Sequence, residues 1–225
     1  MNKHDRPTAA HLRPTELIDS DADGIIRFAR QHARGSNERE RAVSLYYAVR
    51  DGVRYDAYCV DLSPAGMRSS QALETGRGWC VTKAALLAAV ARAVGVPARV
   101  GYADVRNHLS TERMRRTMKT DLFIWHGYTE LWLDEGWVKA TPAFNIELCE
   151  RFGIHALDWD GAADSLYHPF DQAGRRHMEY VRQRGSFDDV PLSAIVADFT
   201  AFYPGMADSG MRQADFDAEV QSERS

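Results

Sequence analysis

The most apolar stretch of the chain spans residues 81–94, where Lys83 and Arg92 are the only charges. Ala and Leu occupy most other positions, nearly all round the circumference of a helix, and a helix of this kind is normally buried. Gly95 follows directly, and glycine at this place is typical of a helix C-terminus. We therefore expect a buried central helix that begins at or beside Cys80.

Two further patterns predict the partners of this helix. Residues 36–52 carry an apolar stripe at helical spacing behind a capping residue at their start. Residues 98–105 and 122–141 alternate as strands do. The chain is therefore expected to have an α+β fold, in which the Cys-bearing helix packs against an antiparallel β-sheet.

The second strand segment is expected to be a hairpin with a two-residue turn at Glu135-Gly136, which suits glycine at the second turn position. That pairing places His126 on the strand face that also carries Thr141 and, if pairing continues, Asn145. A three-residue turn would shift this parity.

Length and composition indicate one large domain with appendages, since 225 residues with 44% hydrophobic and 27% charged residues are ordinary for a globular protein. Polar ends flank the periodic part of the chain. The expected units are an arm at 1–18 that is laid on the surface or disordered, a single domain at 19–205, and a frayed polar tail at 206–225. Within the domain, the core motifs span about 38–145 and an extension spans 146–205.

Charge and cysteine usage exclude several classes of function. A net charge of -4 and a pI near 6.1 argue against nucleic acid as the main partner. No apolar run approaches the roughly 18 residues of a membrane span, and the N-terminus lacks the apolar core of a signal peptide, so a cytoplasmic protein is expected. Three cysteines without a Cys-x-x-Cys pair predict neither a disulfide framework nor a metal or cofactor site.

Cys80 is the cysteine with a physical reason to be reactive. The segment Gly76-Arg77-Gly78-Trp79 leads into it, and glycines there allow the backbone to approach a substrate closely. At the first turn of a helix, unpaired N–H groups and the positive end of the helix dipole favour an anion, so we expect a lowered thiol pKa. Cys59 and Cys149 lie in mixed apolar surroundings and are expected to pack in the interior.

Gly78-Trp79-Cys80, the Ala/Leu-rich helix and the sequence Gly-Val-Pro-Ala-Arg-Val at 95–100 resemble the nucleophile segment of the transglutaminase-like superfamily, a branch of the papain-like Cys-His-Asp thiol enzymes. The family pattern continues with a His that opens a strand, matched here by His126. It then has an Asp before a Pro, and Thr141 stands in that place. The resemblance covers roughly residues 38–145.

This resemblance implies a thiol enzyme that cleaves or transfers an amide acyl group through a Cys thioester, as a protease, amidase, deamidase or transamidase. Cys80 is the expected nucleophile, and His126 is expected to hold its thiolate as an ion pair and then to protonate the departing amine. Asn145 or Thr141 would orient His126 in place of the family Asp. The substrate would be a peptide, a protein or a small amide, and the alternative is a domain that has lost its chemistry and serves as a binding module.

A basic and irregular insertion, residues 107–120, separates the two expected strands. It would be either a flap over the active site that favours acidic substrates, or a solvated helix face, which is the commoner role of such a charge run.

Overall fold

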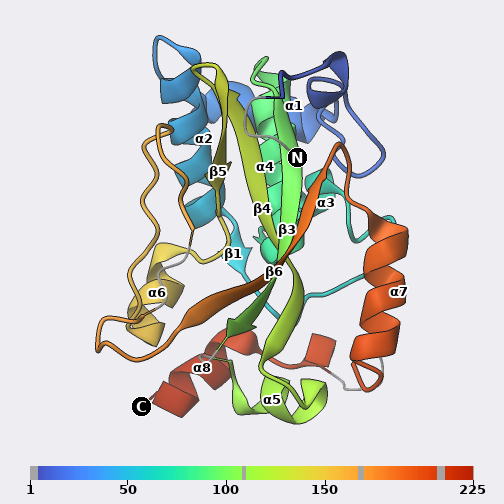
Figure 1. Cartoon of the computed structure of the whole chain (residues 1–225), viewed down its shortest axis with the longest axis vertical. Coiled ribbons are helices and arrows are strands. Elements are labelled where there is room, and N and C mark those ends of the chain that lie inside the picture. Colours follow the sequence, from blue (N-terminus) through green and yellow to red (C-terminus); the bar gives the residue numbers. More distant parts are fainter. Residues whose placement is uncertain (1–4, 108–109, 167–169, 207–210, 225) are drawn as a thin grey trace.

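Helix α4 (Cys80–Ala93) runs through the middle of the molecule (Figure 1). The computed structural model describes residues 5–107, 110–166, 170–206 and 211–224. Every residue of α4 from its first to Arg92 is buried, as the apolar pattern predicts. Both charges are hydrogen-bonded: the Lys83 amine donates to the carbonyls of Arg50 and Val53, and the Arg92 guanidinium donates to the carbonyl of Ala98.

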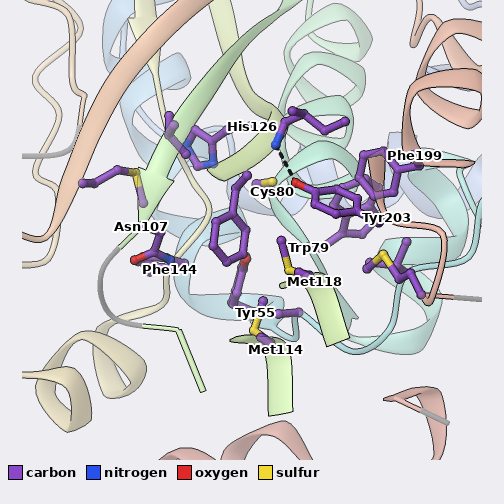
Figure 2. Close-up of a pocket in the computed structure, with 17 residues that line it drawn as sticks. Tyr55, Trp79, Cys80, Asn107, Met114, Met118, His126, Phe144, Phe199 and Tyr203 are labelled. Carbon is purple, nitrogen blue, oxygen red and sulfur yellow. Dashed lines mark hydrogen bonds between the residues drawn. The ribbon is translucent and has the colours of Figure 1, made fainter. Parts of the chain in front are cut away.

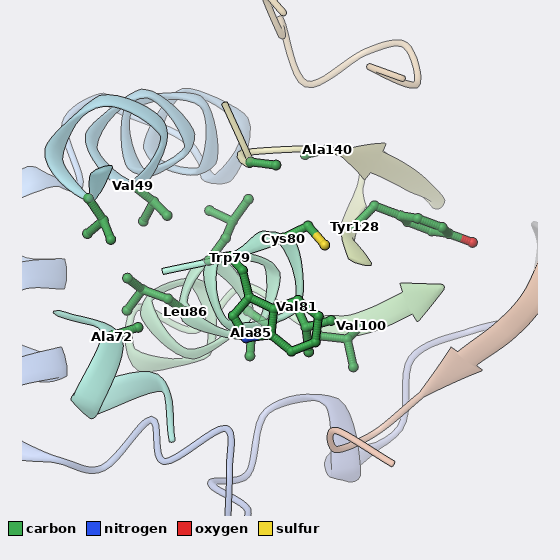
Figure 3. Close-up of a cluster of buried hydrophobic side chains, with 14 of the residues drawn as sticks. Val49, Ala72, Trp79, Cys80, Val81, Ala85, Leu86, Val100, Tyr128 and Ala140 are labelled. Atoms are coloured by element: carbon green, nitrogen blue, oxygen red, sulfur yellow. The ribbon is translucent and has the colours of Figure 1, made fainter. Parts of the chain in front are cut away.

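An antiparallel sheet of four strands packs on one side of α4. Its order is β5-β4-β3-β6, and the predicted α+β class is therefore confirmed. The strands are β3 (Ala98–Asn107), β4 (Leu122–Leu133), β5 (Gly136–Ala140) and β6 (Met178–Phe187). Buried apolar side chains of α4, the sheet and the surrounding helices form the core, part of which Figure 3 shows.

The other elements surround this pair of layers. Helices α1 (Asp23–His32), α2 (Glu38–Gly52) and α3 (Ser69–Thr75) all contact α4. Strands β1 (Arg54–Tyr55) and β2 (Arg77–Gly78) form a small parallel sheet just before α4. The remaining elements are η1 (Ala9–His11), α5 (Glu112–Met118), α6 (Ile146–Phe152), α7 (Leu192–Phe202), η2 (Met211–Gln213) and α8 (Phe216–Arg224).

The hairpin between β4 and β5 turns one residue earlier than predicted. Leu133 pairs with Gly136, so the two turn residues are Asp134 and Glu135, with φ of 46° and 67°. Two positive φ values are the geometry of a type I′ turn, whose twist matches that of the strands. The residue numbers of each pair sum to 269 instead of the predicted 271. Each partner is therefore displaced by two residues, which leaves it on the same face of the strand, so the predicted sharing of faces is unchanged.

The prediction of a frayed C-terminal tail is wrong for its described helical part. Residues 216–224 form helix α8, which buries Phe216 and Val220. The described part of the N-terminal arm lies against the fold, where the Trp137 indole donates to the carbonyl of Asp5 at 2.6 Å. Residues 1–4, 207–210 and 225 of these two segments lie outside the described residues. Among the helices described, none has the length and apolar character that a membrane crossing requires.

Candidate active site

Cys80 is the first residue of α4, and its side chain faces a pocket at that end of the helix (Figure 2). Trp79 is the N-cap in an extended conformation, and its backbone N–H donates to the Thr82 hydroxyl at 3.1 Å. The sequence favours this arrangement because the extended β2 and Trp79 are followed, from Lys83 on, by a run of strong helix formers. The Cys80 backbone N–H therefore belongs to the first helical turn, where N–H groups lack partners within the helix.

Gly127 allows strand β4 to lie directly against the start of α4. A Cβ atom at Gly127 would stand 3.0 Å from the Cys80 carbonyl oxygen and 3.0 Å from the Val81 Cα. Real Cβ atoms rarely approach backbone so closely, so only glycine fits this position without a shift. The N–H of Gly127 also acts on the Cys80 sulfur as a hydrogen-bond donor to its ionised form. The glycine after His126 thus brings the histidine strand to the cysteine.

A break in strand β4 sets the direction of His126. Trp125 has a φ of 60°, and the pairing of β3 with β4 shifts between Ala103 and Val105. Such a bulge re-aims the neighbouring side chain, and a left-handed backbone at a residue other than glycine needs support from its surroundings. Here the Trp125 N–H donates to Asp104 at 3.1 Å, and its indole donates to Asp198 at 2.8 Å.

Arg184 of β6 joins these two carboxylates. Its guanidinium pairs with Asp104, lies 2.5 Å from the Asp198 carboxylate, and stacks 4.5 Å above the Trp125 ring. The pair of Arg184 and Asp104 is shielded from water, since these side chains are 12% and 7% exposed, whereas the Asp198 side chain is 42% exposed. The network fixes the residue immediately before His126 and therefore the course of the strand at the site.

The pocket brings Cys80 and His126 together, as the sequence predicts (Figure 2). Apolar and aromatic side chains form most of its wall, and none of the described residues lining it is an Asp, Glu, Lys or Arg. The lining residues include Tyr55, Trp79, Asn107, Met114, Met118 and Tyr203. The free volume is only about 50 Å³.

Burial dominates the electrostatics of this site. It raises the pKa of the Cys80 thiol to about 11, although the N–H groups of Gly127 and Val81 act in the opposite direction. Burial also lowers the pKa of His126 to about 4, and the nearby His177 adds to that effect. At neutral pH both groups are therefore uncharged in this closed pocket. The expected lowering of the thiol pKa by the helix end is wrong for this state.

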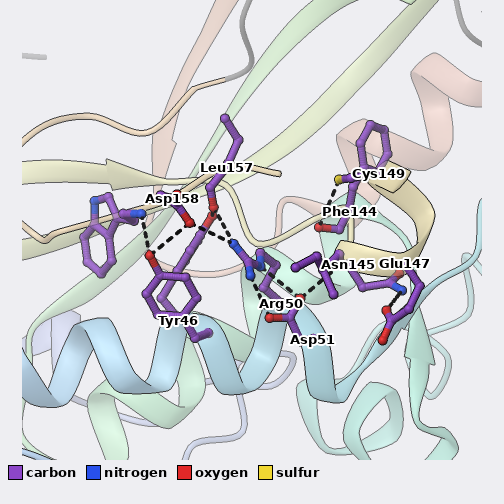
Figure 4. Close-up of polar contacts among 12 residues, drawn as sticks. Tyr46, Arg50, Asp51, Phe144, Asn145, Glu147, Cys149, Leu157 and Asp158 are labelled. Atoms are coloured by element: carbon purple, nitrogen blue, oxygen red, sulfur yellow. Dashed lines mark hydrogen bonds and ion pairs between the residues drawn. The ribbon is translucent and has the colours of Figure 1, made fainter. Parts of the chain in front are cut away.

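Neither residue expected to orient His126 lines this pocket. The Thr141 hydroxyl donates to the carbonyl of Ser165 at 3.0 Å. The Asn145 side chain accepts from the Tyr55 N–H at 3.0 Å and donates to Glu147 at 2.7 Å (Figure 4). The contacts of the Asn145 side chain therefore hold Tyr55 in place. A role for Thr141 or Asn145 toward His126 stays a prediction.

Several residues of the site were missed in the sequence. Tyr55 comes from β1, and burial, to which the charge of an ionised Cys80 adds, raises the pKa of its hydroxyl well above the usual value. Met114 and Met118 come from α5, and Tyr203 follows α7. Helical spacing of the two methionines within the basic insertion was the one pattern that could have shown an apolar face there.

Comparisons with known proteins agree with this fold. The model of the transglutaminase-like superfamily matches residues 26–142, slightly more than half of the chain. A crystal structure described as "a Putative Cysteine Protease from Cytophaga hutchinsonii" superposes with a TM-score of 0.51 at 13% identity. The match covers 83% of this chain and 49% of the other, so this chain spans about half the length of that protein. A search of curated proteins found no match.

Proposed function

Since the chain belongs to the transglutaminase-like superfamily, we propose that it is a thiol enzyme that cleaves or transfers an amide acyl group through a thioester on Cys80. The observation that carries this proposal is the meeting of Cys80, at the start of a buried helix, with His126 in one pocket. A nucleophile, a base and hydrogen-bond donors at a helix start are the parts that acyl transfer requires.

In the proposed reaction the Cys80 sulfur attacks the carbonyl carbon while His126 takes the thiol proton. The tetrahedral oxyanion accepts a hydrogen bond from the Cys80 backbone N–H. When the carbon–nitrogen bond breaks, His126 gives its proton to the departing amine and the acyl group remains as a thioester. Water then releases the acid, or a second amine takes the acyl group.

Two side chains in the pocket can supply a second donor to the oxyanion. One is the Tyr55 hydroxyl, which lies close enough to Cys80 for their charges to interact. The other is the Trp79 indole, whose buried N–H has no acceptor among the described residues. Replacing the true donor should lower kcat about 100-fold with little change in KM, so Tyr55→Phe and Trp79→Phe identify it.

The proposal is tested by acylation with a small activated ester such as p-nitrophenyl acetate. Mass spectrometry should find one acetyl group on Cys80, and release of nitrophenol should show a burst followed by slow turnover. Cys80→Ala should abolish both, whereas the matched variants Cys59→Ala and Cys149→Ala should retain them. Equal turnover in Cys80→Ala and the wild type would refute the proposed nucleophile.

The second candidate is a binding module that has lost its chemistry. It is favoured by the uncharged state of the buried thiol and imidazole and by the missing Asp before Pro142. A folded protein whose Cys80 takes no acetyl group, even from the activated ester in large excess, would favour the module.

A further inference from the structure

The catalytic pocket is narrow in this structure. Its free volume of about 50 Å³ holds a few water molecules but no segment of a polypeptide. An amide can reach the Cys80 sulfur only if part of the wall moves. Packed cores resist such movement, so the moving part is expected among the elements that contribute few side chains to the core.

Helix α5 is a part of the wall that reaches the core with only two buried side chains, Met114 and Met118. It is an excursion between β3 and β4 and sends Met114 and Met118 into the pocket (Figure 2). Its other face is basic and exposed to solvent, because the side chains of Arg113 and Arg115 are 43% and 51% exposed. Methionine side chains are flexible and adapt their packing easily. The helix therefore acts as a cover whose apolar face seals the site.

Helix α8 holds this cover down. The two helices lie side by side at one end of the molecule (Figure 1). Glu219 of α8 lies 2.6 Å from the guanidinium of Arg113, and Glu223 accepts from the backbone N–H of Glu112 at 2.8 Å. The Tyr58 hydroxyl adds a bridge, with Thr111 and Glu219 each at 2.6 Å.

The first residues of α8 contact other parts of the domain. Asp217 pairs with Arg54 at 3.1 Å and with Arg151 at 3.2 Å. The Phe216 ring packs against Tyr55 at 5.9 Å between centroids. Phe216 also lines a smaller cavity that shares Tyr55 and Met114 with the catalytic pocket. The start of α8 therefore reaches the vicinity of the site itself.

We propose that α8 is an intramolecular latch that closes the catalytic pocket by occupying an arginine-lined entrance, which in the open state binds an acidic segment of a polypeptide. The four arginines of this entrance come from three separate elements of the chain, β1, α5 and α6. They are Arg54, Arg113, Arg115 and Arg151. When α8 leaves, these side chains lose their carboxylate partners, and an acidic chain restores the lost contacts.

The test uses the rate at which iodoacetamide labels Cys80 in the full-length protein, read by peptide mass spectrometry. The buried Cys149 serves as an internal reference for the integrity of the fold. The variant carries Glu219→Gln with Glu223→Gln. An exposed ion pair typically changes an equilibrium by up to about five-fold. The variant loses the contacts of two glutamates, so we expect its Cys80 labelling to be about ten-fold faster than that of the wild type. Asp134→Asn, which removes an exposed ion pair with Arg39 at the hairpin turn, is the matched control.

Three further results belong to the same test. Arg113→Gln should also speed labelling, and adding it to Glu219→Gln should give little more, because both changes break one pair. Salt at about 0.5 M should speed labelling of the wild type more than that of the double variant. Labelling of Cys149 should stay unchanged throughout.

The latch is refuted if the double variant labels Cys80 no faster than Asp134→Asn. It is also refuted if labelling of Cys149 rises in parallel, since the fold as a whole has then loosened. The test needs no turnover, so failure of ester hydrolysis leaves it intact and bears only on the proposed function.

The ligand of the entrance is tested with a peptide of residues 211–224 added to the double variant. It should slow Cys80 labelling toward the wild-type rate, while the same peptide with its four carboxylates replaced by amides should not. Equal effects of the two peptides, or no effect of either, would refute an acidic ligand.

Discussion

The contact between Gly127 and the first turn of α4 allows a sharp test of how the site is assembled. In Gly127→Ala the new methyl group would lie 3.0 Å from both the Cys80 carbonyl oxygen and the Val81 Cα. Ordinary contacts of a Cβ atom lie at 3.4–4 Å, so β4 and the helix start must separate by a few tenths of an ångström. Both neighbours are backbone atoms and cannot rotate away.

The expected cost is that of overpacking, about 1–3 kcal/mol in the free energy of unfolding. For a chain of this length each kcal/mol lowers Tm by about 2–4 °C. The same separation moves His126 relative to the Cys80 sulfur, and displacements approaching 1 Å cost up to about 100-fold in rate. We therefore expect the rate of Cys80 acylation to fall ten-fold or more at temperatures where the variant is fully folded.

Thermal unfolding and the acetylation burst measure the two effects separately. Gly136→Ala is the matched control, because a Cβ there meets nothing within 4 Å. The reasoning is refuted if Gly127→Ala and Gly136→Ala have equal Tm values and equal acylation rates. A large fall in Tm with an unchanged rate of acylation would show that His126 keeps its position relative to Cys80 in the variant.

Two further predictions concern buried charges. Asp104→Asn removes the charge that pairs with Arg184 beside the bulge, and should cost about 1–3 kcal/mol in denaturant unfolding and slow Cys80 acylation. In Lys83→Met, the difference in stability from the wild type should depend on pH, because burial lowers the pKa of Lys83 to about 7. The unfolded chain binds this proton up to pH about 10.4, so wild-type stability relative to the variant should rise from pH 7 to 9 by about 1.4 kcal/mol per unit. A difference that stays constant over this range would mean that the buried amine keeps its ordinary pKa.

The central part of the fold could be predicted because local patterns and tertiary structure agree there. The apolar circumference of residues 81–94 predicts burial of α4, and alternation predicts the strands on which it packs. The position of His126 beside Cys80 was implied by the resemblance to the transglutaminase-like superfamily. The turn at Asp134 and Glu135 was missed because both residues take positive φ. Glycine adopts such values more readily, so Gly136 was expected to be one of the two turn residues.

The surroundings of the pocket could not be predicted, because they depend on contacts between segments far apart in the sequence. Residues 206–225 are polar, and only packing of Phe216 and Val220 against the domain makes a helix there stable. The thiol pKa was mispredicted for a related reason. A helix start lowers the pKa of an accessible thiol, but how far α5 and α8 exclude water from Cys80 is a property of the folded chain.

The pH dependence of Cys80 labelling connects the pKa values of the site with its closure. With a pKa of about 11, the thiolate fraction of the closed protein at pH 7 is about one in ten thousand. Labelling of the wild type should then rise about ten-fold per pH unit up to pH 10, without a plateau at low pH. Opening of the latch admits water and removes the main cause of both shifted pKa values, so Glu219→Gln with Glu223→Gln should show an added plateau near neutral pH from the pair of thiolate and imidazolium. That plateau should vanish when His126→Ala is added, whereas a plateau already present in the wild type would mean that the ion pair exists before opening.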